Sequence, residues 1–178
     1  RMGLGLLASS NTPLDYLRDH SLTLNVQDVP AVSKALQPFG SQLASYYEEA
    51  AQNDELSTKQ RFIATCFLAS LSPDSSLWSQ ESVIEFITAQ IISVAPTEID
   101  AAKKIFLPKK DLFIEPLLLV YGDQSQSDIH LLFAKSYLLD YCQDSPEKLF
   151  DSLGLSPQKY FQEFFQLLEP FRDSALQQ

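Results

Sequence analysis

Apolar positions between residues 32 and 50 recur at steps of three and four, the spacing of one face of an α-helix. The members of this stripe are Val32, Ala35, Leu36, Phe39, Leu43, Tyr46, Tyr47 and Ala50. Pro38 and Gly40 lie inside the stripe, and both residue types interrupt helices. The pattern therefore predicts helix on both sides of a kink or short break at residues 38–40.

Two more helical stripes follow. Ser57 and Gln60 have the form of a capping box, which predicts a helix that begins there and ends at Ser72-Pro73-Asp74. Its inner face carries Phe62, Ile63, Cys66, Phe67, Ser70 and Leu71. The next stripe, with Ser79 as the expected cap, is apolar around much of its circumference and is the best candidate for a central helix: Val83, Ile84, Phe86, Ile87, Ile91, Ile92 and Val94.

The middle of the chain is less regular. Thr97 begins a shorter helix by the same capping logic, and Pro108 stops it. The apolar run at residues 117–120 fits a buried strand, but Pro116 at a first helical turn and Gly122 just past the end favour a short buried helix. Ser125 or Ser127 then caps a helix whose inner face carries Ile129, Leu132, Phe133, Tyr137, Leu138 and Tyr141.

Two Ser-Pro pairs mark the last helices. Ser145-Pro146 and Ser156-Pro157 each place a cap before proline at the first helical position, and Gly154 closes the first of these helices. Seven to nine helices are expected, arranged as an irregular all-α multi-helix bundle or as stacked helical hairpins. We expect one helical domain over residues 28–178 after an irregular segment at 1–27, in which Leu22, Leu24 and Val26 alternate like a short extended stretch. No repeat with a period of 20–50 residues is apparent.

Charge excludes some classes of function. The 13 basic and 23 acidic residues give a net charge of −10, and residues 1–89 and 90–178 carry −5 each. No part of the chain has the large cationic surface of a nucleic-acid or anionic-membrane binder. Cys66 and Cys142 form no metal or disulfide pattern and are expected to be small core residues. No apolar run is long enough to cross a bilayer, so the cytoplasm is the default compartment.

Residues suited to catalysis are few. His20 and His130 lie in no set spaced to bind a metal, and the acidic pairs Glu48-Glu49 and Asp54-Glu55 are expected on a solvated helix surface. No phosphate-binding glycine loop, nucleophile elbow or zinc-protease motif is present. We therefore expect no catalytic residue, no metal site and no cofactor.

One cationic segment stands out from this acidic chain. Residues 103–110 contain Lys103, Lys104, Lys109 and Lys110. Four lysines in eight residues can attract an acidic partner surface, whereas lysines at a helix end also simply complement the helix dipole. The four lysines are therefore candidate partner-binding residues.

The final helix has more aromatic residues than one core stripe requires. Phe161 and Phe165 are candidates for contact with a partner, with burial between neighbouring helices as the alternative. Residues 145–166 also resemble the helix–turn–helix pattern, with a turn at Gly154. The would-be recognition helix presents aromatic and acidic residues, which fit poorly against phosphates.

The sequence favours a non-enzymatic helical module or adaptor that binds another protein. A helical bundle that binds an apolar small molecule is the main alternative. A transcriptional regulator that uses residues 145–166 is a further one.

Overall fold

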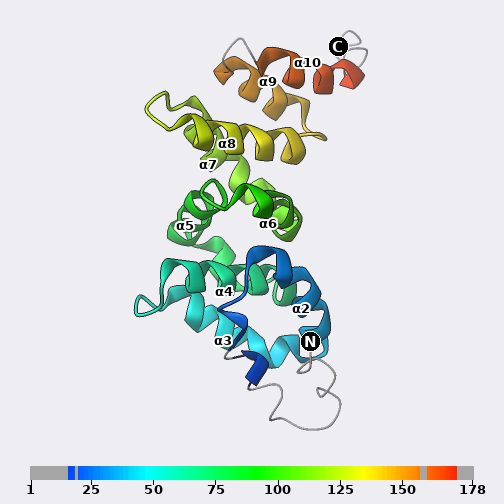
Figure 1. The fold of residues 1–178 in the computed structure, drawn as a ribbon. Coiled ribbons are helices and arrows are strands. Elements are labelled where there is room, and N and C mark those ends of the chain that lie inside the picture. Colours follow the sequence, from blue (N-terminus) through cyan, green and yellow to red (C-terminus); the bar gives the residue numbers. More distant parts are fainter. Residues whose placement is uncertain (1–15, 19, 157–159, 172–178) are drawn as a thin grey trace. The chain divides into compact units, whose positions relative to one another are not determined.

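The computed structural model describes residues 16–18, 20–156 and 160–171. This part of the chain is helical throughout, with no strand, so the predicted all-α multi-helix architecture is confirmed (Figure 1). Within the same residues, no single helix is both long and apolar enough to cross a bilayer. The expected extended stretch at Leu22–Val26 is wrong: residues 22–24 form turns, and Val26–Asp28 form a 3-10 helix.

The chain divides into two compact units. Unit 1 comprises residues 1–83 and 95–108, and unit 2 comprises residues 84–94 and 109–178. The boundary passes through α5 (Glu81–Ile91), which belongs mainly to unit 2. A single domain over residues 28–178 remains a prediction.

Unit 1 is organised around α4 (Thr58–Leu71). Helices α2 (Val29–Leu36), α3 (Gly40–Gln52) and α6 (Ile99–Phe106) all pack on it, so α4 is buried without interruption from Phe62 to Ala69. The rings of Tyr47 and Phe67 stack at 4.8 Å between α3 and α4. A 3-10 turn at Gln37–Phe39 separates α2 from α3, which confirms the break expected at Pro38 and Gly40.

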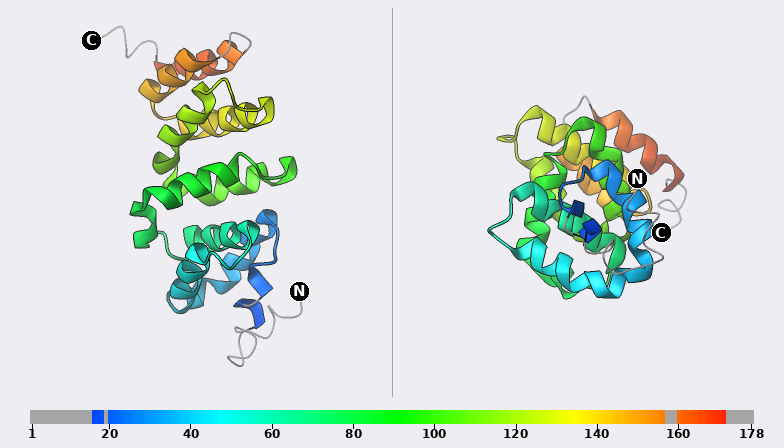
Figure 2. Two further views of the ribbon diagram at one scale, coloured as in Figure 1. Left: turned by 90° about the vertical axis from the view of Figure 1, so that its left-hand side faces the viewer. Right: turned by 60° about the horizontal axis from the view of Figure 1, so that its bottom comes forward.

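Unit 2 contains α7 (Asp111–Gly122), α8 (Asp128–Tyr141), α9 (Pro146–Leu155) and α10 (Phe161–Leu168). Helix α7 packs on α8 and α9, and α10 packs on α9, a pairing visible in the left-hand view of Figure 2. The core includes Phe113, Leu117, Tyr141 and Phe164, all with no exposed surface. The nearly buried Lys135 on α8 bonds to Glu163 at 2.7 Å, and its ammonium lies 4.0 Å from the centre of the Tyr160 ring.

The succession of elements in residues 26–71 recurs 70 residues later. The 3-10 helices Val26–Asp28 and Gln37–Phe39 correspond to Pro96–Glu98 and Leu107–Lys109, and α2 corresponds to α6. Helices α3 and α7 end at residues 52 and 122, and α4 and α8 span residues 58–71 and 128–141. We call residues 26–71 the first copy and residues 96–141 the second copy.

Many equivalent positions in the two copies are buried in both, although the amino acids differ. Buried apolar residues match at Leu36 and Phe106, Leu43 and Phe113, Ile63 and Phe133, and Leu68 and Leu138. Ser57 and Ser127 cap α4 and α8 in the same way, each accepting a bond from the backbone N–H three residues later. The period of 70 residues lies outside the range in which the sequence showed no repeat. The two copies therefore share their pattern of buried apolar residues and their helix caps.

Several predicted helix ends are wrong. Gly122 and Gly154 are the last and next-to-last residues of their helices, and neither has positive φ, so neither acts as a left-handed cap. Pro116 lies inside α7, not at its first turn. Ser79 belongs to a 3-10 helix at Ser76–Ser79 because Leu77 and Trp78 are buried there, and α5 begins at Glu81. Ser156 is the C-cap of α9, while residues 157–159 lie outside the described part of the chain.

Candidate functional site

Exposed apolar side chains are concentrated on unit 2. In the described part of the chain, ten large apolar side chains are classed as exposed, and only Tyr16 and Leu107 of these belong to unit 1. We call the other eight the apolar surface of unit 2: Leu112, Leu119, Ile129, Leu132, Phe150, Leu155, Phe161 and Phe165. Leu119, Phe150 and Leu155 of this set line one groove, and a contiguous exposed apolar patch marks an interaction site more often than scattered apolar residues do.

The first copy shows that the fold does not require an apolar residue at three of these positions. Leu119 is 77% exposed, and its equivalent in the first copy is the exposed Glu49. Exposed Gln42 is the equivalent of Leu112, and exposed Lys59 is the equivalent of Ile129. The same helical positions therefore accept polar or charged side chains in unit 1, so packing alone does not account for Leu112, Leu119 and Ile129.

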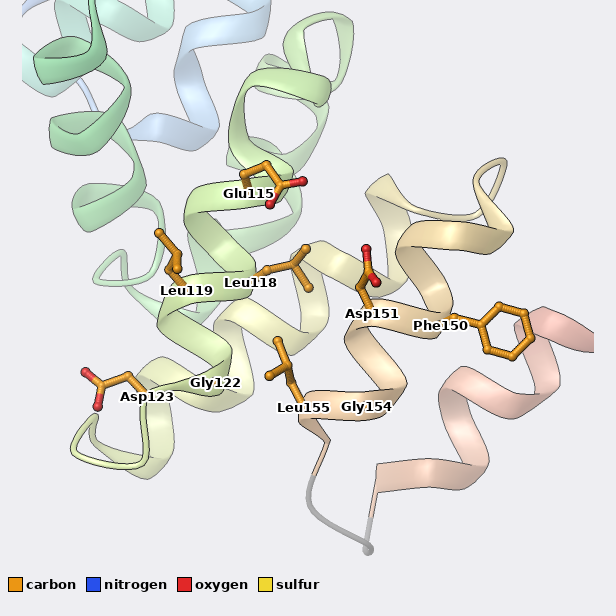
Figure 3. A pocket seen from close by; sticks show the side chains of 9 residues that line it. All are labelled: Glu115, Leu118, Leu119, Gly122, Asp123, Phe150, Asp151, Gly154 and Leu155. Carbon is orange, nitrogen blue, oxygen red and sulfur yellow. The ribbon is translucent and has the colours of Figure 1, made fainter.

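Part of this surface is a groove of about 720 Å³ between α7 and α9. Figure 3 shows Leu118 and Leu155 pointing into the gap between the two helices. Leu119 and Phe150 complete the apolar lining, and Leu118 forms a nearly buried floor. Leu119 also lines a smaller hollow of about 400 Å³ between α5, α7 and the start of α8, so it forms a ridge between two depressions.

Each helix contributes a glycine to the groove. A Cβ on Gly122 would lie 3.1 Å from the Leu155 side chain, so this glycine allows α7 and α9 to approach closely. A Cβ on Gly154 would meet nothing within 4 Å. Glycine weakens a helix by up to about 1 kcal/mol relative to alanine. Neither packing nor backbone conformation requires glycine at position 154, and the space beside it is open.

The rim of the groove is acidic. It carries the carboxylates of Glu115, Asp123 and Asp151, and the ammonium of Lys148 lies beside Glu115 and Asp151. Lys148 donates a hydrogen bond to Glu115 and lies 3.9 Å from Asp151, and the bond to Glu115 raises the pKa of Lys148. Hydrogen bonds from Ser125 and Gln126 lower the pKa of Asp123. By formal charge, the three carboxylates and the one ammonium leave a net charge of −2 at the rim.

The four sequence-predicted lysines are divided between the units. Lys103 and Lys104 lie on α6 in unit 1, whereas Lys109 and Lys110 belong to unit 2. Lys104 is exposed and the other three are partly buried. The ammonium of Lys110 lies 2.6 Å from both carboxylate oxygens of Asp144, and this bond lowers the pKa of Asp144. Lys110 is thus engaged within unit 2.

The two predicted aromatic residues of the last helix are exposed. Phe161 is 44% exposed and Phe165 is 67% exposed, one helical turn apart on α10. Phe164 and Leu168 point inward instead, and the Phe164 ring lies 5.9 Å from that of Tyr121. Gln158 and Lys159, which would begin a DNA-reading helix, lie outside the described residues.

The two cysteine side chains are buried, and the two histidine side chains make local contacts. Both thiols are buried, and burial raises the pKa of Cys142 to about 11 and that of Cys66 well above its usual value. His20 and His130 make local contacts with Tyr16 and Gln126, one helical turn away. No group of three metal-binding side chains occurs in the residues that the structure describes.

Sequence reasoning missed the groove residues on α7 and α9. The sequence predicts a buried segment at residues 117–120, because a run of four apolar residues does not show which of them faces solvent. Leu118 is nearly buried as predicted, whereas Leu119 is exposed. The available signal was the 70-residue recurrence, which pairs these leucines with Glu48 and Glu49. Comparisons with protein-family models, curated proteins and solved structures found no match.

Proposed function

We propose that this chain is a non-enzymatic module that binds another protein through the apolar surface of unit 2. One observation carries the proposal: exposed apolar side chains gather on unit 2, while the first copy has polar residues at the equivalent positions Gln42, Glu49 and Lys59. Exposing these side chains to water is unfavourable unless a partner covers them. Phe161 and Phe165 belong to this surface, and the cytoplasm remains the proposed compartment.

The lysines at residues 103–110 remain a separate prediction. They favour an acidic partner surface, but Lys110 already bonds to Asp144 within unit 2. The proposal therefore rests on the apolar surface and not on these lysines.

Site-specific photo-crosslinking in source cells tests the proposal. A benzophenone side chain is placed on unit 2 at Leu119, Ile129 or Phe165, and at the matched first-copy positions Glu49 and Lys59. We expect discrete adducts with the same partner from one or more unit 2 positions and none from the matched positions. Equal adducts from both sets, or no adduct from any position, would contradict the proposal.

Binding of an apolar small molecule is the alternative that the groove volume permits, since pockets for small ligands occupy about 300–1,000 Å³. Native mass spectrometry of the purified chain separates the two functions. A bound small molecule together with an absence of crosslinked protein would favour the alternative.

A further inference from the structure

We propose that the groove between α7 and α9 binds an amphipathic helix of a partner protein, with apolar side chains in the groove and Lys or Arg along the flanks. This inference rests on the proposed function and adds the site and the chemistry of the partner. It makes the groove, and not α10, the main point of attachment.

The form of the groove favours a helix over an extended peptide. The described residues include no strand, so no sheet edge is available for strand addition. A polyproline peptide needs an aromatic-lined groove, and Phe150 is the one aromatic residue of this lining. Helix α7 has 12 residues, or about 18 Å at 1.5 Å per residue, which accommodates about three turns of a second helix beside it.

The charge around the groove favours a basic partner. Glu115, Asp123 and Asp151 surround the apolar lining, and Lys148 balances only one of the three charges. Unit 2 as a whole has 6 basic and 12 acidic residues, for a net charge of −6. Flanking Lys or Arg side chains would relieve this excess, while an acidic helix would be repelled. An uncharged helix would lose this contribution.

Two residues indicate that another chain occupies the groove. Leu119 stands where the first copy has Glu49, so burial inside the fold does not explain it. Gly154 leaves open space where any other side chain would project into the groove. A partner helix lying on Leu119 and passing close to Gly154 accounts for both.

A peptide selection against the full chain tests this inference. A phage library of random peptides of about 18 residues, long enough for about five helical turns, is selected on immobilised wild-type protein. We expect enriched peptides with apolar residues at i, i+3 or i+4, and i+7, and with an excess of Lys and Arg. Their affinity should fall several-fold as NaCl rises from about 0.05 M to about 0.5 M, because salt screens the rim charges.

Three variants locate the binding site of a selected peptide. Gly154→Trp fills the groove from a position with open space, and Leu119→Glu installs the first-copy residue; each should weaken binding by about tenfold or more. Gln42→Glu adds a negative charge at an exposed position of the first copy, outside the groove lining and outside the apolar surface of unit 2, and should leave binding unchanged. Far-UV circular dichroism checks that all three variants fold.

Different results would contradict different parts of the inference. Enrichment of acidic or uncharged peptides, or no enrichment, would overturn the inference about the partner. Equal binding to wild type, Gly154→Trp and Leu119→Glu would overturn the site. Crosslinks from Phe165 but none from Leu119 would leave the proposed function standing while removing the groove as its site.

Discussion

Tyr47 links burial, hydrogen bonding and pH at the scale of one residue. Its ring has no exposed surface and stacks on Phe67, and its hydroxyl donates to Ser21 at 3.0 Å. Burial raises the pKa of Tyr47 from 10.0 to about 12. The folded state therefore holds this proton at pH values where the unfolded chain has lost it, and stability falls as the pH rises from 10 toward 12.

We expect Tyr47→Phe to reduce this alkaline loss. The linkage relation gives Tyr47 a contribution of about 2 kcal/mol to the loss at the upper end of that range. At neutral pH the variant should lose about 1 kcal/mol through the missing bond to Ser21. Urea unfolding at a series of pH values measures both effects. A variant whose stability falls in parallel with the wild type above pH 10 would show that Tyr47 is not the responsible group.

At the scale of the element, the sequence predicts that Ser57 and Ser79 both cap a helix, and only Ser57 does so. Ser57 and Gln60 form the predicted capping box at the start of α4. The hydroxyl of Ser79 instead bonds to the carbonyl of Ser76, inside a 3-10 turn. A helix cap joins residues three or four positions apart, so the sequence can reveal it. The cap expected at Ser79 does not form because the neighbouring Trp78 is buried and Ser79 is part of a 3-10 helix.

We expect Ser57→Ala to cost about 1 kcal/mol of stability, because it leaves the backbone N–H of Gln60 without its acceptor. Ser79→Ala, the control, should change stability by less than about 0.5 kcal/mol because it removes no cap. Chemical denaturation monitored by circular dichroism provides both values. Equal costs for the two variants would mean that the Ser57 cap is not formed in solution.

At the scale of the whole molecule, the net charge predicts that the chain does not bind DNA. The net charge of −10 lowers affinity for any polyanion, and the resemblance of residues 145–166 to a helix–turn–helix does not offset it. The described part of α10 presents Phe161, Glu163 and Phe165, not a row of cations.

We therefore expect no binding of the full chain to labelled duplex DNA in fluorescence anisotropy, even at about 0.05 M salt, where electrostatic binding is strongest. Wild-type protein and a Lys109→Glu variant should behave alike. A rise in anisotropy that disappears with added salt would restore the transcriptional regulator as a candidate.

The sequence by itself determined the helical class, the break at Pro38 and Gly40, and the cap at Ser57, because each depends on local periodicity or on contacts a few residues apart. It left Ser125 and Ser127 as alternatives, and the structure shows that Ser127 is the cap of α8. Only the tertiary structure decided which face of an apolar run meets solvent. Leu117 is buried and Leu119 is 77% exposed, although both belong to the same run. The sequence alone also did not show that the space beside Gly154 is open. Exposure depends on which helices pack together, and those contacts join residues far apart in the chain.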